Sequence, residues 1–234
     1  MKPASVIAGA GTAGVLGAAL IVAAMHVIPP SGDLDPVRRT ISEYALLANG
    51  WAFDLAVLVL AAGSALILGI LVARRVVPAR SLGFVGLSLW SLGLAGVVLF
   101  PKHNWASPTQ LAIGPSATGD IHRAASLVAF LSLPVAAIAI GRAWRRGERW
   151  RGHANTVLTA GVVALLCLAP LGYAILTGPL TGVRWWRAIP LGAVERAIAL
   201  SEVVVVLAFG VWATRAGVAQ DPAASDQQEL AAVR

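Results

Sequence analysis

The 234-residue chain is 58% hydrophobic and only 12% charged, whereas a typical soluble domain is about 25% charged. Its net charge of +7 does not indicate nucleic-acid binding, because the basic residues flank apolar runs and form no continuous patch. The single cysteine, Cys167, excludes an intrachain disulfide and a cysteine-based metal cluster. The composition therefore predicts an integral membrane protein whose principal partner is the lipid bilayer.

Six apolar segments are each long enough to cross a bilayer as a helix, which requires about 20 mostly apolar residues. The runs are continuous rather than alternating, and a helix satisfies its own backbone hydrogen bonds in lipid. We therefore expect an all-α fold, a polytopic membrane bundle of six transmembrane helices. The predicted spans are Ala4–Ile28, Trp51–Ala73, Ser81–Phe100, Ile121–Gly141, Thr156–Leu176 and Leu191–Ala213.

The distribution of basic residues predicts that both termini lie in the cytoplasm. The loops around Arg75 and Arg146 are the most basic, and a six-span chain places them on the same side as its two ends. The loop around Asp35 then faces outward. We expect residues 1–217 to form one domain in the cell (plasma) membrane, followed by a flexible cytoplasmic tail over residues 218–234.

Prolines and small residues inside the spans predict features of helix shape and packing. Pro134 and Pro170 remove a backbone donor from the fourth and fifth spans, which predicts a kink in each. Gly9, Ala13 and Gly17 in the first span recur at helical spacing, which is suited to close helix packing in lipid.

Ionisable residues gather at the predicted outer ends of the spans. His26 lies near the end of the first span, Asp54 near the start of the second, His122 near the start of the fourth, and Glu195 with Arg196 near the start of the sixth. Such groups need a partner, an aqueous cavity or the headgroup region. In one bundle we expect them to converge on a single outward-facing vestibule. The candidate binding residues of this vestibule are His26, Ser42, Glu43, Asp120, Arg196 and Glu202.

Glu202 lies seven residues after Glu195, about two turns deeper on nearly the same helical face. The pair would extend a polar path toward the midplane; the alternative is that Glu202 is protonated or hydrogen-bonded between helices. Successive helical residues point about 100° apart. We therefore expect Glu195 to face the vestibule, and Arg196 to reach the headgroups or a loop carboxylate such as Asp33 or Asp35.

The histidines raise the question of a metal site, which their spacing does not decide. His26, His103 and His122, with Asp54 or Glu195, would make a chemically sensible zinc set. Their spacing is not diagnostic, because no HxxxH or HExxH pair is present, and interfacial or carboxylate-bonded histidines are the favoured alternative. The sequence itself requires no cofactor.

Ser42 and Glu43 favour a helix cap or a loop hydrogen bond over a serine nucleophile, because no adjacent base can be assigned.

Several short motifs in the chain resemble the bacterial membrane family catalogued as domain of unknown function 998. The likeness covers roughly Val6 to Trp212, and the order and spacing of its elements carry most of its specificity. It implies a multi-helix membrane fold and supplies no activity or catalytic assignment. The motifs are the stretch from His26 through Pro30, Asp35, Arg39 and Ile41-Ser42-Glu43-Tyr44 to Gly50-Trp51, then Phe100-Pro101, Gly119-Asp120-Ile121-His122 and Glu195-Arg196.

Three functions fit these observations. The first is binding of a small polar molecule, an ion or a lipid headgroup in the vestibule, in a transport-related form with Glu202 assisting proton movement. The second is a membrane-embedded enzyme acting on a lipid or isoprenoid-like substrate, with Asp54, His122 and Glu195 as catalytic candidates for acid, base or metal-ligand chemistry. The third is a non-catalytic accessory protein. The sequence leaves the ligand and the oligomeric state open.

Overall fold

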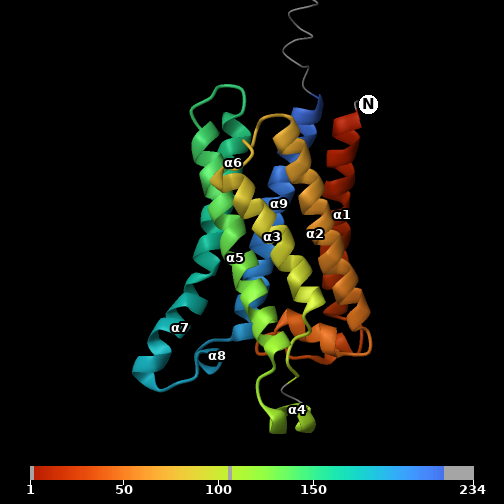
Figure 1. The fold of residues 1–234 in the computed structure, drawn as a ribbon, viewed down its shortest axis with the longest axis vertical. Helices are drawn as coiled ribbons and strands as arrows, with labels where there is room; N and C mark the ends of the chain where they lie inside the picture. Colours follow the sequence, from red (N-terminus) through yellow and green to blue (C-terminus); the bar gives the residue numbers. More distant parts are fainter. Residues whose placement is uncertain (1–2, 105–106, 219–234) are drawn as a thin grey trace, which may run out of the picture.

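The computed structural model describes residues 3–104 and 107–218, and in them it contains helices and no strand (Figure 1). The described part of the chain has six helical spans long and apolar enough to cross a membrane. This confirms the predicted polytopic all-α fold. The spans are α1 (Pro3–Met25), α2 (Gly50–Ala73), α3 (Leu82–Leu99), α5 (Ala117–Trp144), α6 (Arg151–Cys167) continued by α7 (Ala169–Thr181), and α9 (Leu191–Val218).

The expected cytoplasmic tail is outside this description from residue 219 onward, and Val218 is the last residue of α9.

The two prolines that were expected to kink their spans, Pro134 and Pro170, occupy different positions in the helices. The fifth span breaks at Leu168, between α6 and α7, two residues before Pro170. A proline ring disfavours helical geometry in the residue before it and leaves a carbonyl one turn back without its donor. Beyond this break α7 leans away from the bundle (Figure 1). Helix α5, in contrast, continues through Pro134.

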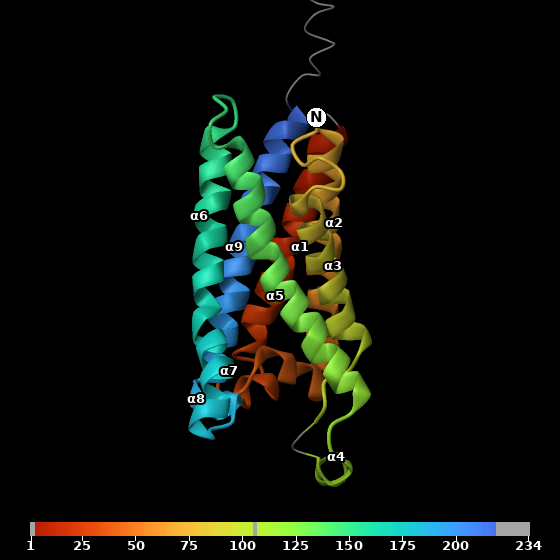
Figure 2. The same ribbon diagram turned by 60° about the vertical axis from the view of Figure 1, so that its left-hand side comes forward.

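The spans form a closed ring in which each packs against its neighbours in the order α1, α2, α3, α5, α6 and α9, and α9 returns to α1 (Figure 2). Helix α9 also contacts α2 and α5 across the ring. Helix α9 therefore faces several helices at once.

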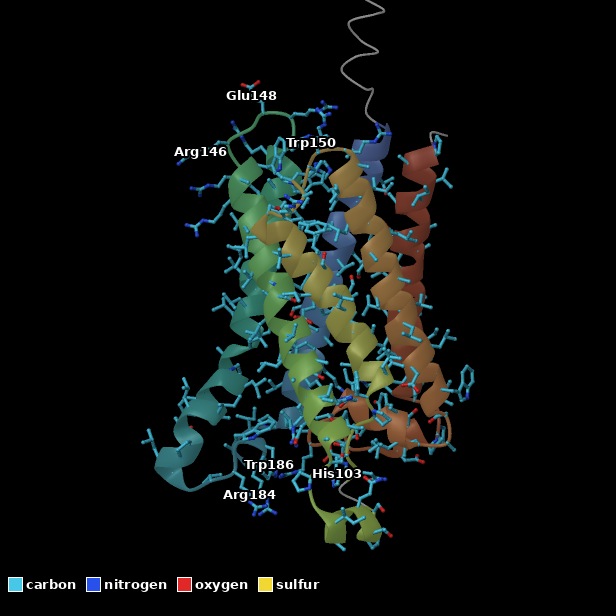
Figure 3. The ribbon with its side chains drawn as sticks, in the orientation of Figure 1. His103, Arg146, Glu148, Trp150, Arg184 and Trp186 are labelled. Atoms are coloured by element: carbon cyan, nitrogen blue, oxygen red, sulfur yellow. The ribbon has the colours of Figure 1, made fainter. Side chains whose placement is uncertain are left out.

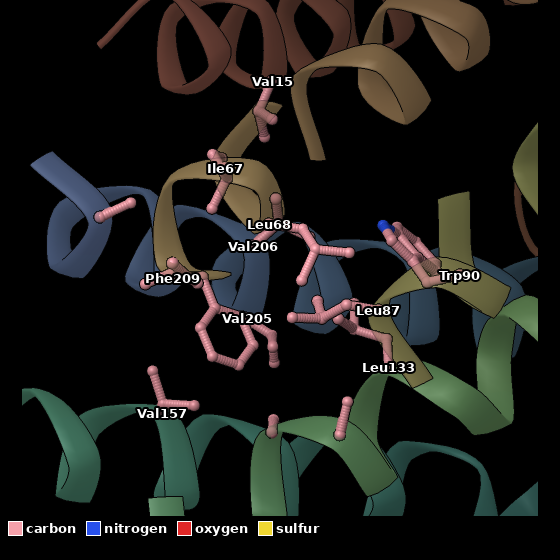
Figure 4. Packing of buried hydrophobic residues seen from close by; sticks show 14 of the residues in the cluster. Val15, Ile67, Leu68, Leu87, Trp90, Leu133, Val157, Val205, Val206 and Phe209 are labelled. Carbon is pink, nitrogen blue, oxygen red and sulfur yellow. The ribbon is translucent and has the colours of Figure 1, made fainter. Parts of the chain in front are cut away.

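The hydrophobic core lies where these helices face one another (Figure 4). Trp90 of α3 is buried there, and its indole N–H donates to Ser64 Oγ of α2 at 3.0 Å. Ser64 in turn donates to Leu60 O at 2.7 Å. The indole N–H of Trp90 and the hydroxyl of Ser64 therefore both have a hydrogen-bond partner, as burial at membrane depth requires. The labelled core residues are Val15, Ile67, Leu68, Leu87, Trp90, Leu133, Val157, Val205, Val206 and Phe209.

Helices α1 and α2 make backbone contact through glycines. A Cβ on Gly63 would lie 2.7 Å from Gly11 O, and a Cβ on Gly11 would lie 2.9 Å from Gly63 O. In contrast, a Cβ on Gly9 or Gly17 would meet nothing within 4 Å. The expectation that Gly9 and Gly17 form the packing face of the first span was wrong, because α2 approaches the neighbouring face that contains Gly11.

The two ends of the bundle differ in structure. The terminal end, where α1 begins and α9 ends, has only short connections between helices (Figure 1). The capped end contains four short helices, and residues 26–49, named the cap segment here, lie across it. The short helices are η1 (Ser31–Asp33), η2 (Ile41–Leu46), α4 (Pro108–Ile113) and α8 (Trp185–Ala188).

Candidate functional site

A cavity of about 410 Å³ lies inside the bundle, between α1, α2, α3, α5 and α9, with η2 lining it at the capped end. Its walls are mostly apolar and include Phe53, Val57, Trp90, Leu94 and Phe130. The polar side chains that line it are His26, Ser42, Ser126, Glu195, Arg196 and Glu202.

Arg196 of α9 holds the cap segment through backbone carbonyls. Its Nη1 donates to Pro36 O at 2.8 Å, Arg39 O at 2.7 Å and Gly192 O at 3.0 Å. The cap segment approaches so closely that a Cβ on Gly192 would lie 2.4 Å from Arg39 O. The acceptors of Nη1 are thus carbonyls and not the Asp33 or Asp35 carboxylate that the sequence suggested.

His26 and Tyr44 complete the surroundings of the Arg196 guanidinium. Arg196 Nε donates to His26 Nε2 at 2.8 Å, and Arg196 Nη2 donates to Tyr44 Oη at 2.9 Å. His26 Nδ1 lies 2.8 Å from Val22 O. Because a carbonyl only accepts and a guanidinium only donates, this geometry assigns the hydrogen to Nδ1 and the lone pair to Nε2. His26 therefore acts here as an acceptor for Arg196.

Glu195 binds the backbone of the cap segment rather than a side chain. Its Oε2 accepts the Ile41 N–H at 3.0 Å. The N–H of Ala193, two residues earlier, donates to Val37 O at 3.1 Å. The start of α9 therefore both donates hydrogen bonds to the cap segment and accepts them from it.

A second polar cluster lies beside this one and is centred on Glu43. Glu43 Oε1 accepts from Thr40 N at 3.3 Å and Thr40 Oγ1 at 3.0 Å, and Oε2 forms an ion pair with Arg39 Nε at 2.6 Å. Lys102, just after α3, lies 3.5 Å from Glu43 Oε1, donates to Ser42 Oγ at 3.1 Å and also donates to Thr40 Oγ1. The loop hydrogen bonds expected for Ser42 and Glu43 are present.

His122 of α5 lies behind the cavity wall, close to the end of α3. Its Nδ1 is 3.0 Å from both Val97 O and Phe100 O, so it donates to carbonyls that the end of a helix leaves free. Its Nε2 is buried with no hydrogen-bond partner in the described residues. Asp54 of α2 interacts electrostatically with His122. Neither residue lines the cavity, whereas Glu195 does.

His103 and Asp120 lie at the capped end, away from the cavity lining. His103 Nδ1 is 3.4 Å from Ser116 Oγ, and exposed Asp120 forms an ion pair with Arg123. Figure 3 shows His103 at the capped end near α4. Within residues 3–104 and 107–218, no group of three or more His, Cys, Asp or Glu side chains is arranged to hold a metal ion. The structure therefore separates the three histidines proposed for zinc.

Glu202 is the deepest ionisable group of the cavity. Its side chain is 0% exposed, and it lies on α9 about two turns from Glu195. Neither carboxyl oxygen has a hydrogen-bond partner in the described part of the chain.

The candidates chosen from the sequence did not include Lys102, Tyr44 or the cavity-lining Ser126. Tyr44 lies within the Ile41-Ser42-Glu43-Tyr44 motif, which was a usable signal. Lys102 follows Phe100-Pro101, but nothing in the sequence relates it to Glu43, 59 positions earlier.

Comparison with known proteins gave one match. The model of a family described as "Protein of unknown function (DUF998)" matches residues 12–212, a range that contains the cavity and the cap segment. No curated protein and no solved structure matches the chain.

Proposed function

We propose that this chain, which belongs to the DUF998 family of proteins of unknown function, binds an apolar or amphipathic molecule that enters its cavity from the bilayer. The observation that carries the proposal is the cavity itself, whose walls are mostly apolar, with most of its polar groups at the capped end and Glu202 deeper. Its volume of about 410 Å³ is within the range of about 300–1,000 Å³ typical of small-molecule sites.

The chemistry of the walls favours a lipid-like ligand over a hydrated ion. An ion without its water shell needs several polar partners, and the Arg196 donors are already engaged with the cap segment and His26. An acyl or isoprenoid chain needs only apolar contact, which Val57, Leu94 and Phe130 provide.

Entry from the bilayer is supported by exposure on two facing helices. Ala23 of α1 and Leu200 of α9 both line the cavity, yet both are exposed on the bundle surface, Leu200 at 69%. Toward the terminal end, α1 and α9 meet through Thr12 and Gly210. Toward the capped end, His26, which directly follows α1, accepts a hydrogen bond from Arg196 of α9. We propose that the ligand enters between Ala23 and Leu200, and we name this place of entry the window.

Photolabelling in liposomes tests the proposal. A long-chain alkyl probe carrying a diazirine reacts with whatever it touches on illumination, and peptide mass spectrometry locates the product. Phe53, Ala56 and Val57 of α2 are buried but line the cavity. We expect saturable labelling of these residues, because the probe reaches them only from inside the cavity.

Two variants of α1 test the route. Ala23→Trp places an indole at the window and should reduce labelling of Val57 severalfold. Ala13→Trp, on an exposed position of the same helix that does not line the cavity, should leave it unchanged. Labelling confined to the lipid-exposed residues Leu55 and Leu58 would contradict the proposal.

We also propose that the terminal end faces the cytoplasm and the capped end the outside of the cell membrane. The support is the charge distribution, because cytoplasmic loops collect Lys and Arg. In Figure 3 Arg146 lies at the terminal end and Arg184 at the capped end. The connections of the terminal end contain Arg74, Arg75, Arg80, Arg145, Arg146 and Arg149, and the adjoining helix ends add Arg142 of α5 and Arg151 of α6.

A further inference from the structure

Glu202 is a buried acid for which residues 3–104 and 107–218 provide no hydrogen-bond donor. It is 0% exposed, lines the cavity, and neither Oε1 nor Oε2 has a hydrogen-bond partner among the described residues. Buried polar groups are nearly always hydrogen-bonded, because a missing bond in an apolar environment is costly. The missing donor is therefore expected to come from a molecule in the cavity.

The cations closest to the cavity are engaged elsewhere. Arg196 donates to His26, Tyr44 and the cap segment, and Lys102 to the Glu43 cluster. No ion pair within residues 3–104 and 107–218 includes Glu202. Cys167 of α6 is a titratable neighbour of Glu202, but a thiol supplies no positive charge. A negative charge on Glu202 therefore has no compensating cation in the described bundle.

We propose that the cavity binds a lipophilic primary amine, with its ammonium group on the Glu202 carboxylate and its hydrocarbon chain along the apolar walls. An ammonium carries three N–H donors and one positive charge, so it satisfies both carboxyl oxygens and leaves the pair neutral. An alcohol brings one donor and no charge. This inference rests on the proposed function and adds the chemical class of the ligand.

The amine reaches Glu202 at the level of the window. Glu202 lies next to Val203, and both line the cavity together with Ala19 and Ala23 of α1. A molecule that passes between α1 and α9 therefore meets this carboxyl group about two turns from the Arg196 guanidinium. The distance along the helix limits repulsion between Arg196 and the bound ammonium.

Competition with the photoreactive alkyl probe tests the inference in full-length protein in liposomes. Dodecylamine, dodecanol and dodecyltrimethylammonium are each added over a concentration series, and protection of Val57 from labelling is measured. We expect dodecylamine to protect at a concentration about tenfold or more below dodecanol, from the strength of hydrogen bonds to charged groups. Dodecyltrimethylammonium, which has the charge without N–H donors, should protect less well than dodecylamine.

Variants separate Glu202 from a general membrane effect. Glu202→Gln should weaken protection by dodecylamine about tenfold or more and change protection by dodecanol little. Glu148→Gln removes an exposed carboxylate at the terminal end and should change neither. The wild-type comparison of amine with alcohol needs no variant, so it decides the question even if Glu202→Gln folds poorly.

The outcomes are distinct. If Val57 is labelled but amine and alcohol protect it equally, the assignment of the ligand to an amine is wrong and the proposed function stands. Labelled Val57 with amine protection unaffected in folded Glu202→Gln overturns the role of Glu202. Equal protection by dodecyltrimethylammonium and dodecylamine overturns the assignment to a primary amine. Absence of labelling at Val57 overturns both the proposed function and this inference.

Discussion

Arg196 and Glu195 are adjacent in the chain and bind the same cap segment, one as a hydrogen-bond donor and the other as an acceptor. Arg196 donates to the carbonyls of Pro36 and Arg39, and Glu195 accepts the N–H of Ile41. A short irregular segment leaves backbone groups of both kinds without partners, and each needs one when buried. The planar five-donor guanidinium suits several carbonyls at once, which a lysine ammonium does not reproduce.

Substitution of Glu195 distinguishes its hydrogen bond from its charge. Glu195→Gln keeps an oxygen that accepts the Ile41 N–H, so we expect the free energy of unfolding to change by less than about 1 kcal/mol. Glu195→Ala leaves that N–H without a partner and should lower it by about 1–3 kcal/mol. Reversible unfolding in mixed micelles measures both, and equal effects of the two variants would contradict this role.

At this scale the sequence indicates which residues matter and not what they contact. His26, Glu195 and Arg196 are visible as polar residues at the ends of apolar runs. The bond between His26 and Arg196 joins positions 170 apart, and no local pattern encodes such a pair. The carbonyls that Arg196 meets have no side-chain signature at all, which is why a loop carboxylate was the expected partner.

Helices α1 and α2 pack closely because glycine removes the side chain from the contact. Helices in lipid gain little from the hydrophobic effect, so close approach and van der Waals contact stabilise their association. Gly11 and Gly63 face each other across this contact.

Two glycines of α2 provide a matched test. Gly63→Ala would place Cβ 2.7 Å from Gly11 O, so the helices must separate and we expect a loss of about 1–3 kcal/mol in unfolding free energy. A Cβ on Gly69 meets nothing within 4 Å, so Gly69→Ala should raise stability by up to about 1 kcal/mol through helix propensity. Unfolding of the two variants in the same detergent measures the difference. Equal stability of the two would exclude the close contact.

The length of the apolar runs was sufficient to predict the six spans, because bilayer thickness sets the length of a spanning helix. The predicted packing face of the first span was wrong, because small residues spaced three or four positions apart occur on several faces of that helix. Pro170 correctly marked a distortion in the fifth span. Its form, a break at Leu168 followed by a helix leaning away from the bundle, depends on packing between helices.

The whole molecule has one strongly basic end, and orientation in the membrane follows from it. In a Cys167→Ala background, single cysteines replacing Arg75 or Arg146 should react with a membrane-impermeant maleimide only from the cytoplasm. Cysteines replacing Asp35 or Thr109 should react only from outside, because the first pair lies at the terminal end and the second at the capped end. Reaction of positions 35 and 75 from the same side would contradict the proposed orientation.

The cavity could not have been predicted from the sequence, because it is formed between helices that are distant in the chain. The sequence predicted a vestibule of converging polar groups. The structure instead places Asp54, His122 and Asp120 outside the lining and surrounds Glu195, Arg196 and Glu202 with apolar walls. The volume between helices depends on the tilt and separation of all of them together, which residue patterns do not specify.

The central claim is that a molecule from the bilayer occupies this cavity, and labelling of two adjacent residues tests it most directly. Val57 is buried and lines the cavity, whereas Leu58 is 42% exposed on the bundle surface and does not line it. With rising concentrations of unlabelled alkyl competitor, we predict that diazirine labelling at Val57 falls to background, while labelling at Leu58 declines only with dilution of the probe in the lipid. No labelling at Val57, or parallel decline at the two positions, would contradict the claim.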